Sequence, residues 1–596
     1  MFRPTGKSCL LLALAPLMSG VVAVHAVAKC QIEKLVEVPI TMEGLRPMVS
    51  AKINDRDARF VLDSGAFYSI ISSATAAEFD LKLAYGRGLT VRGIGGMADA
   101  SVTKITKFTI ADLSIQNVEF LVGGSEVGGS GLLGQNFLDR WDDEYDFAKG
   151  VLRLFKAEDC RKAVLAYWIT PGQSFSEMRI EEGREGHGSR RTIGEGYVNG
   201  TKIRVKFDTG AWTSVLTLKA AAHAGINIDS PGVVDAGYSR GIGPGVAKQY
   251  IARFSSFKIG DGEEIKNSRL RMADIDLLDA DMLLGADFFV SHHVYVANSQ
   301  HKLYLTYNGG PVFNLSKGAS AQEPAPPGAS IETADSPNDA AELSRLGAAS
   351  ATRRDFDTAI ADLSKAVELS PDEPEYLYQR ALVYRQSGQV KPALDDLDRA
   401  LLLKPDFLFA YLPRAEIRLH EKNVDAAIAD LDALDRLAAR QSDLRLVIAA
   451  RYEAADRYSP AITQYDLWIQ YHPNDSRIVA ALGARCLASA LQNQDLPGGL
   501  DSCNRGLKIA DKKNPHYGIL FANRGFIRLR QGENAKAISD FDATLKILPK
   551  SALALCGRGI AKSRTGNTSA GEADIADAVR IAPNIEAQLE RRGITP

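Results

Sequence analysis

The hydrophobic pattern changes character once along the chain. From Gln31 to about Tyr307, short runs alternate apolar and polar positions and are separated by glycine-rich breaks, as β-strands and turns are. The clearest runs are RPMVSAKI, ARFVLDSG, KFTIADLSI, TKIRVKFDTG, ARFSSFKIG and KLYLTY. From about residue 340 to the C-terminus, the apolar positions follow helical spacing instead. The pattern therefore predicts an all-β part followed by an all-α part.

Between these parts lies a stretch with little to bury. The sequence from Lys317 to Asp339, KGASAQEPAPPGASIETADSPND, is rich in Pro, Ala and Ser. Such composition is typical of a semi-extended linker. We place this linker at residues 311–339.

The helical part repeats itself at a fixed period. Six prolines are separated by 34, 68, 42, 34 and 34 residues, so a 34-residue period holds apart from one insertion; they are Pro371, Pro405, Pro473, Pro515, Pro549 and Pro583. An unrelated helical bundle has no reason to keep this period. The region resembles tetratricopeptide repeats, whose helix-turn-helix units have this length. We expect about seven repeats over residues 340–596, forming an all-α solenoid.

Inside the β part, one motif occurs twice. RFVLDSGAFYSII begins at Arg59 and RVKFDTGAWTSVL begins at Arg204, so each carries an Asp directly after an apolar strand. Each Asp is followed, 71 or 77 residues later, by the Gly of a Leu-Leu-Gly sequence that ends at Gly134 or Gly285. A short helix-like piece and a closing hairpin come next in both copies. A single Asp-Thr-Gly is weak evidence, but this ordered recurrence predicts a duplicated β-domain.

Each copy also holds a glycine-rich tip between two strand-like runs. The tips are Gly93, Ile94, Gly95 and Gly96 in the first copy, and Gly241, Ile242, Gly243 and Pro244 in the second. Together with the Asp motifs, they make residues 35–307 resemble the retroviral-type (retropepsin-like) aspartic proteases. The resemblance implies a bilobal all-β protease with one half at 29–165 and the other at 166–310. Both halves stand in one chain, so a monomer is expected to be active.

The resemblance assigns a role to each motif. It implies that Asp63 and Asp208 are the catalytic pair and that the glycine-rich tips are flaps closing over the substrate. Ser64 and Thr209 would hold the two active-site loops together, and the loop glycines would be Gly65 and Gly210. The apolar-apolar-Gly strand would cross behind each loop.

The chemistry can be argued without the family. Two carboxylates about 3 Å apart share a proton, because both cannot ionise comfortably. The ionised member then activates a water while the protonated member polarises the scissile carbonyl. No cofactor or metal is needed for this reaction. Ala66 and Ala211 offer no hydroxyl to stabilise the ionised pair, so activity should extend to mildly acidic or near-neutral pH.

A non-catalytic alternative uses the same modules. In that case the protease-like halves and the repeats form a peptide-binding scaffold. Both Asp motifs are intact, which favours an active endopeptidase acting on a protein or peptide substrate. Repeat solenoids present long surfaces suited to protein segments, so we expect the repeats to dock this substrate or a protein partner.

The N-terminus and the cysteines bear on location. Residues 1–28 place two basic residues before an apolar run that ends in Ala-Val-Ala, the pattern of a signal peptide, and an uncleaved anchor is the alternative. We expect export to a bacterial periplasm, with no membrane span afterwards. Export allows disulfides. Cys486 and Cys503 lie symmetrically about a helix turn, so we predict a disulfide between them, and Cys30 and Cys160 flank the first half, so we predict a second one there, with Cys556 left free.

Charge and isolated motifs add less. With 71 basic and 73 acidic residues the net charge is -2, which gives no sign of a nucleic-acid partner. WDDEYD from Trp141 to Asp146 reads as a solvated helix end. His292 and His293 read as a helix-end or surface pair, and Phe67 and Trp212, after the active-site loops, favour core packing.

Overall fold

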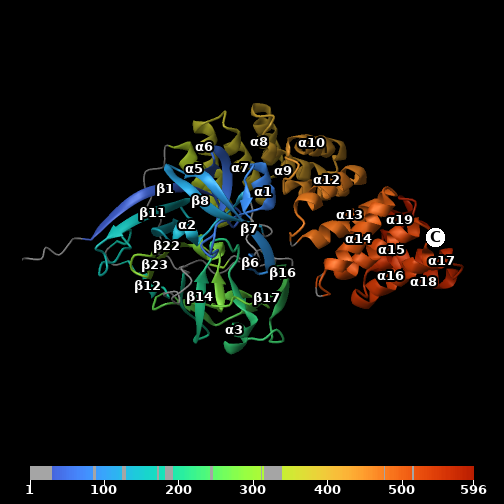
Figure 1. The fold of residues 1–596 in the computed structure, drawn as a ribbon, viewed down its shortest axis with the longest axis horizontal. Helices are drawn as coiled ribbons and strands as arrows, with labels where there is room; N and C mark the ends of the chain where they lie inside the picture. The colour runs from blue at the N-terminus through green and yellow to red at the C-terminus, as the bar shows by residue number, and fades with distance from the viewer. Residues whose placement is uncertain are drawn as a thin grey trace, which may run out of the picture.

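The computed structural model of the protein describes residues 30–596 except for 85–88, 124–128, 171–172, 182–191, 240, 242–245, 263, 311, 314–338, 476, 513 and 515. Strands dominate up to Tyr307 and helices follow from Ala340 (Figure 1). The expected multidomain architecture, all-β and then all-α, is confirmed. The proposed signal peptide and nearly all of the proposed linker lie outside the described residues. Among the residues described, no helix is long and apolar enough to cross a membrane.

The first half is a strongly twisted, mostly antiparallel sheet. Its elements are β1 (Gln31–Glu43), β2 (Arg46–Ile53), β3 (Arg56–Leu62), β4 (Ile70–Ile71), α1 (Ser73–Glu78), β5 (Leu83–Ala84), β6 (Thr90–Gly93), β7 (Gly96–Ile110), β8 (Leu113–Gly123), β9 (Gly131–Leu133), α2 (Gln135–Leu138), β10 (Asp142–Asp146) and β11 (Val151–Glu158). Phe60, Phe108 and Phe120 are fully buried and contact one another, with Phe60 edge-on to Phe108 and Phe120 tilted against it.

The second half repeats the plan of the first. Its elements are β12 (Ser176–Arg179), β13 (Ile193–Val198), β14 (Thr201–Phe207), β15 (Val215–Thr217), α3 (Leu218–His223), β16 (Val234–Ser239), β17 (Ala247–Arg253), β18 (Ser256–Ile259), β19 (Glu264–Lys266), β20 (Arg269–Ala273), β21 (Met282–Leu284), α4 (Ala286–Phe289), β22 (His292–Ala297) and β23 (Lys302–Tyr307).

The duplication is visible in strand order. In the first half β9 lies between β3, to which it is parallel, and β4, to which it is antiparallel. In the second half β21 lies between β14, to which it is parallel, and β15, to which it is antiparallel. The chain that connects β3 to β4, or β14 to β15, must therefore pass over the end of the intervening strand. That connection carries the Asp motif in both halves.

The halves are joined by a continuous sheet. β10 of the first half pairs with β22 of the second, antiparallel from Asp143 opposite Val296 to Asp146 opposite His293. All five residues of β10 are buried. The segment expected to be a solvated helix end is thus an interior strand. Burial of these acidic residues is possible because groups of the second half reach them: Ser299 donates its backbone N–H and its hydroxyl to Asp142 at 2.8 and 2.7 Å.

In Figure 1 the helical part begins above the strands and its later repeats extend to the right. Its helices pair in sequence as α5 (Ala340–Thr352) with α6 (Phe356–Leu369), α7 (Pro374–Gln386) with α8 (Val390–Leu403), α9 (Leu408–His420) with α10 (Val424–Leu437), α11 (Leu444–Ala454) with α12 (Tyr458–Tyr471), α13 (Ile478–Gln492) with α14 (Leu496–Ile509), α15 (Tyr517–Arg530) with α16 (Asn534–Ile547), and α17 (Ala552–Arg564) with α18 (Thr568–Ile581), before the short α19 (Ile585–Glu590).

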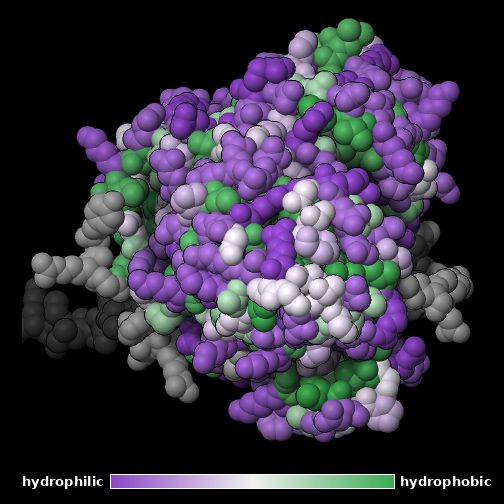
Figure 2. Space-filling view, turned by 90° about the vertical axis from the view of Figure 1, so that its right-hand side faces the viewer, coloured by the Kyte–Doolittle hydropathy of each residue, from purple (hydrophilic) through white to green (hydrophobic). Residues whose placement is uncertain are grey.

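Small buried residues let each pair pack closely. Ala381, Ala393 and Ala400, which lie between the helices of one repeat, are at most 1% exposed. Repeats are also locked by a recurring ion pair between the first helix and the second, sixteen residues apart, as in Arg380 with Asp396 and Arg524 with Asp540. Seen from its C-terminal end, the molecule shows a mostly hydrophilic surface with small, separate hydrophobic areas (Figure 2).

The solenoid begins on the surface of the first half. The hydroxyl of Thr352 in α5 donates to the carbonyl of Gly44 in the β1–β2 turn at 3.0 Å. The guanidinium of Arg59 in β3 lies 5.8 Å from the ring centre of Phe409 in α9. These contacts fix where the later repeats can lie relative to the β part.

Candidate active site

Asp63 and Asp208 each begin the connection that passes over the end of a buried strand. The backbone N–H of Asp63 donates to the carbonyl of Leu133 in β9 at 2.9 Å, and that of Asp208 donates to Leu284 in β21 at 2.8 Å. The Leu-Leu-Gly strand therefore lies behind each loop, as the resemblance implies. Because both strands are fully buried, the loops have a rigid support.

The two loops bond to each other through their hydroxyl residues. Thr209 accepts a hydrogen bond from the Ser64 N–H at 2.9 Å and donates its hydroxyl to the Leu62 carbonyl at 2.7 Å. In return, Ser64 accepts from the Thr209 N–H at 3.0 Å and donates to the Phe207 carbonyl at 3.1 Å. Both side chains are buried. This reciprocal set brings residues 145 positions apart into one compact unit.

Glycine follows each hydroxyl residue because the opposite carboxyl occupies the space of a side chain. A Cβ on Gly65 would lie 2.1 Å from the carboxyl carbon of Asp208, and one on Gly210 would lie 2.3 Å from that of Asp63. Any other residue at either position would push the opposing Asp away. The two aspartates therefore face each other across the junction of the halves.

The environment holds a proton on this pair. Burial, and then the nearby negative charge of Asp208, raise the pKa of Asp63 to about 8. Oδ1 of Asp63 accepts hydrogen bonds from the backbone N–H groups of Gly65 and Ala66 at 3.0 and 2.8 Å, which oppose the rise only in part. In the second loop, Oδ1 of Asp208 accepts from the Ala211 N–H at 3.0 Å. At neutral pH one carboxyl of the pair is thus protonated.

A second duplicated set of polar residues braces the loops, and the sequence reasoning missed it. Ser69 donates its N–H and hydroxyl to Oδ1 of Asn136 at 2.7 and 2.8 Å. Ser214 does the same to Asp287 at 2.8 and 2.7 Å. The signal was present, because each Ser follows the motif Asp by six residues and each acceptor follows the Leu-Leu-Gly glycine by two. Burial raises the pKa of Asp287 to about 7.

The first flap is a hairpin whose tip reaches the second half. β6 and β7 pair from Thr90 opposite Asp99 to Gly93 opposite Gly96, which leaves Ile94 and Gly95 at the turn. Ile94 packs against an apolar cluster of the second half that includes Val215 and Leu283. The second flap corresponds to the β16–β17 hairpin; Ile242, Gly243 and Pro244 lie outside the described residues.

The two tips meet, and charge fixes the first one. A Cβ on Gly241 would lie 3.2 Å from Cβ of Ile94. The guanidinium of Arg92 in β6 forms an ion pair at 2.9 Å with Asp276 of the second half. The flap hairpin therefore spans the junction of the halves, next to the paired aspartates.

Aromatic residues after the Asp motifs differ from expectation. Trp212 is 53% exposed, and the guanidinium of Arg46 from the first half lies 4.1 Å from its ring centre. The preference for core packing is therefore wrong for Trp212. Trp212 lies at the boundary between the halves and not in a core. The cationic Arg46 of the β1–β2 hairpin covers one face of its ring, and the rest of the side chain stays exposed.

The histidine pair is buried, which also corrects the sequence interpretation. His292 is fully buried and stacks on Phe288, while His293 points to the other face of β22 and stacks on Trp168 at 4.0 Å. Nε2 of His293 lies 3.0 Å from Oε1 of Glu144. The sequence interpretation expected a helix end or a surface position. The helix α4 does stop just before the pair, but the pair itself belongs to the interior strand β22.

One buried group near this histidine has ligand types that suit a metal. Ligand atoms of Glu144, Asp146 and His293 lie within 4.8 Å of one another. Glu144, however, already binds the guanidinium of Arg153 and the hydroxyl of Tyr167. Burial alone would raise the pKa of Glu144. The hydrogen bonds from His293 and Tyr167 outweigh burial and hold this pKa below its usual range. A cation would have to displace the guanidinium, so these residues fit a metal poorly and instead tie the two halves together.

The predicted cysteine pairs lie next to each other. The structure has disulfides between Cys30 and Cys160 and between Cys486 and Cys503. The first joins the start of β1 to the end of β11, and the second joins α13 to α14. Cys556 is a buried thiol.

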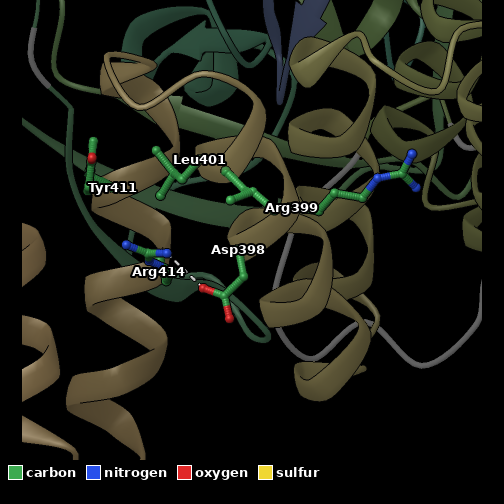
Figure 3. A pocket seen from close by; sticks show the side chains of 6 residues that line it. Asp398, Arg399, Leu401, Tyr411 and Arg414 are labelled. Atoms are coloured by element: carbon green, nitrogen blue, oxygen red, sulfur yellow. Dashed lines mark hydrogen bonds and ion pairs between the residues drawn. The ribbon is translucent and has the colours of Figure 1, made fainter.

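The repeats offer a shallow pocket between α8 and α9. Its walls include Leu401 and Tyr411, and its floor carries an ion pair between Arg414 and Asp398 at 2.7 Å (Figure 3). Arg414 also binds Asp430 in α10, so its guanidinium is held in place. Leu402 at the rim is 82% exposed. Such a mixture of an ordered charge and an exposed apolar side chain suits contact with another polypeptide.

Comparison with known proteins identifies both modules. A family model for aspartyl proteases matches residues 49–137 and again 194–288, and a tetratricopeptide repeat model matches residues 374–407. The first matches contain Asp63 and Asp208, the loops around them and both Leu-Leu-Gly strands. The expected pair of retropepsin-like halves followed by tetratricopeptide repeats is confirmed.

Curated relatives resemble only part of the chain. The Hsp70-Hsp90 organizing protein of Triticum aestivum is 26% identical over 268 residues, which are 37% of this chain and 44% of that protein. The Protein SGT1 homolog of Bos taurus is 27% identical over 135 residues, 22% of this chain and 40% of that protein. The chain spans less than half the length of either relative.

Solved structures that resemble the chain are repeat proteins. A tetratricopeptide repeat protein from Parabacteroides merdae covers 43% of this chain with 98% of its own length, at 17% identity and a TM-score of 0.31. PilW, a type IV pilus biogenesis factor, covers 37% with 97% of its own length, at 17% identity and a TM-score of 0.29.

Proposed function

We propose that this chain, with its two aspartyl-protease halves and its tetratricopeptide repeats, is an aspartic endopeptidase that hydrolyses peptide bonds with the Asp63–Asp208 pair. The observation that carries the proposal is the opposed geometry of the two loops. Each carboxyl lies against the glycine of the other loop, and Ser64 and Thr209 bond the loops reciprocally. Because one chain supplies both carboxylates, the monomer is the expected active form.

The proton state assigns a role to each carboxyl. The raised pKa of Asp63 keeps one proton on the pair, and the carboxyl that carries it donates a hydrogen bond to the scissile carbonyl oxygen. The ionised member takes a proton from a water molecule, whose oxygen adds to the carbonyl carbon and gives a tetrahedral diol. Proton transfer to the amide nitrogen then breaks the C–N bond, releasing an amine and a carboxylic acid. Ser64, Gly65, Thr209 and Gly210 hold the pair, and no cofactor enters the cycle.

Substrate entry requires the flap to move. The tip residue Ile94 packs on the apolar cluster that includes Val215 and Leu283, beside the Asp208 loop. A polypeptide entering the cleft displaces this side chain, and its own apolar side chain takes the vacated position. The first flap hairpin, with its tip at residues 93–96, then closes over the bound segment.

The repeats are proposed to dock a protein substrate or partner, and export is proposed as the setting. The pocket between α8 and α9 and the partial similarity to the Hsp70-Hsp90 organizing protein of Triticum aestivum support docking. Two disulfides support an oxidising compartment such as a bacterial periplasm, reached with residues 1–28 as a signal peptide.

A peptide-binding scaffold without catalysis is the alternative, because the named relatives match the chain only in part. The deciding experiment incubates the purified, exported protein with a diverse peptide library and identifies products by mass spectrometry. We expect cleavage by the wild type and none by Asp63→Asn. Binding of library peptides without cleavage would support the scaffold and refute the protease.

A further inference from the structure

A groove of about 550 Å³ lies between the first flap hairpin and the solenoid. One wall consists of the β6–β7 hairpin with Val246 of the second half. The other wall belongs to the solenoid and is formed by Pro473, Asn474, Asp475, Ile478, Val479, Ile509, Ala510, Asp511 and Asn514. Pockets of this size hold small ligands or a few side chains. The fold thus brings residues about 400 positions apart in sequence to a single cavity.

The flap hairpin separates this groove from the paired aspartates. In an antiparallel hairpin, directly opposed residues share a face and the faces alternate along the strand. Val91 and its partner Ala98 are buried against the cluster that includes Ala66, next to Asp63. Met97 and Asp99 point to the opposite face and line the groove, and Ala98 between them also contributes to its lining. A single two-stranded wall therefore serves the cleft on one side and the solenoid on the other.

The groove presents apolar side chains from both walls to solvent. Met97 of the flap is 59% exposed and Ile509, the last residue of α14, is 47% exposed. Behind them, Ile478 of α13 forms a buried apolar floor. Covering such surfaces releases about 25 cal/mol for each Å² of apolar area. Polar groups of Thr90, Asn474 and Asn514 also line the groove and suit the peptide groups of an extended chain.

We propose that this groove binds an apolar side chain of the substrate polypeptide, remote from the bond that is cut. The occupant is inferred from continuity, because the flap hairpin that forms its wall also covers the cleft, and a chain leaving the cleft passes along the edge of this hairpin. Packed layers lie about 10 Å apart, so the route across the hairpin crosses about 20 Å; an extended chain covers it in about six residues. This inference rests on the proposed endopeptidase function and adds a specificity-determining subsite to it.

The binding of substrate in the groove also couples the solenoid to the flap. A side chain held between Met97 and Ile509 contacts the flap hairpin and the solenoid at once. It therefore favours the flap position in which the cleft is covered. Substrates that lack the remote apolar residue lose both the contact and this bias.

The test is a positional cleavage profile with randomised peptides of about sixteen residues. The wild type is compared with Ile509→Ser and with Ile547→Ser, a matched control. Ile547 is the last residue of α16, is 45% exposed and does not line the groove. We expect the wild type and Ile547→Ser to prefer Leu, Ile, Met or Phe about six residues from the cut bond by about five- to tenfold, as burial of one such side chain allows. Ile509→Ser should lose this preference, and Met97→Ser should lose it from the opposite wall.

Two negative results have different meanings. Cleavage by the wild type with no remote preference, or a preference that Ile509→Ser and Met97→Ser both retain, overturns the groove and leaves the endopeptidase intact. Absence of any cleavage overturns the proposed function, and the groove inference with it. Equal thermal unfolding temperatures of Ile509→Ser and Ile547→Ser establish that the change is one of specificity.

Discussion

The Asp63→Asn variant should be more stable than the wild type at neutral pH, and this difference should grow as the pH rises from 4 to 8. In the folded state the pKa of Asp63 is about 8, whereas the ordinary value is 3.8. When the pKa of a carboxyl is higher in the folded state than in the unfolded state, its contribution to folding stability is complete only below the ordinary pKa. That contribution is lost as the pH rises toward the folded-state pKa, here about 8. The wild type must therefore lose stability between pH 4 and 8. Asn keeps the shape of the protonated carboxyl but has no proton to lose.

The magnitude follows from the pKa difference. Each pKa unit corresponds to 1.36 kcal/mol, so the roughly three units between 3.8 and pH 7 give an upper limit of about 4 kcal/mol. Water reaching the cleft reduces this value, because Asp63 is only partly buried. For domains of this size, each kcal/mol shifts the unfolding temperature by about 2 °C. Asp63→Asn should thus melt up to about 8 °C above the wild type at pH 7, and at nearly the same temperature at pH 4.

Differential scanning calorimetry across pH 4–8 measures this difference. Asp57→Asn is the control, because the Asp57 side chain is 90% exposed and makes only a surface ion pair with Lys52. Asp208→Asn removes the neighbouring charge and isolates the part due to burial, so its pH dependence should lie between those of the wild type and Asp63→Asn. A melting difference between Asp63→Asn and the wild type that stays constant from pH 4 to 8 would refute the assignment of the proton to this buried pair.

Three other outcomes are expected. Peptidase activity should fall as the pH rises through about 8, where the carboxyl pair loses its proton. The variant Ala66→Thr adds a hydrogen-bond donor to the ionised pair, so its pH–rate profile should move toward acid. An unchanged profile would reject that reasoning. Thr209→Val removes the hydroxyl that bonds Ser64 and Leu62, so urea unfolding should show a loss of about 2–4 kcal/mol, whereas a loss below 0.5 would mean the loops are held by other contacts. Cys486→Ser with Cys503→Ser should destabilise the solenoid by about 2–3 kcal/mol, measured by circular dichroism at 222 nm, and an unaltered melting curve would count against a structural disulfide.

The duplicated active-site loops could be predicted because their signals are local. An apolar strand, an Asp, a hydroxyl residue and a Gly stand together in sequence, and the same order recurs with Leu-Leu-Gly at similar spacing. The 34-residue period is equally local and predicts the helix pairs. What the sequence could not supply is the identity of the long-range partners that hold these parts in place.

The strand Asp142–Asp146 illustrates this limit. Five consecutive polar or aromatic residues in it have no apolar alternation, so they resemble exposed sequence. Two of its acidic residues are buried with partners from afar: Ser299 bonds Asp142, and His293 and Arg153 bind Glu144. Ser299 and His293 come from the other half. Likewise, Trp212 stays exposed because Arg46 meets it across the boundary of the halves. Pairings of this kind depend on how the domains assemble, which local patterns do not encode.

The paired-carboxylate mechanism is tested most directly by the kcat/KM of four proteins: the wild type, Asp63→Asn, Asp208→Asn and the double variant, on one peptide selected from the library. The two carboxylates act as a unit, as acid and base in the same step, so each single substitution should reduce kcat/KM by at least about 10³-fold and the double variant should lose little more. Independent, multiplicative losses, or near wild-type turnover by either single variant, would contradict the account.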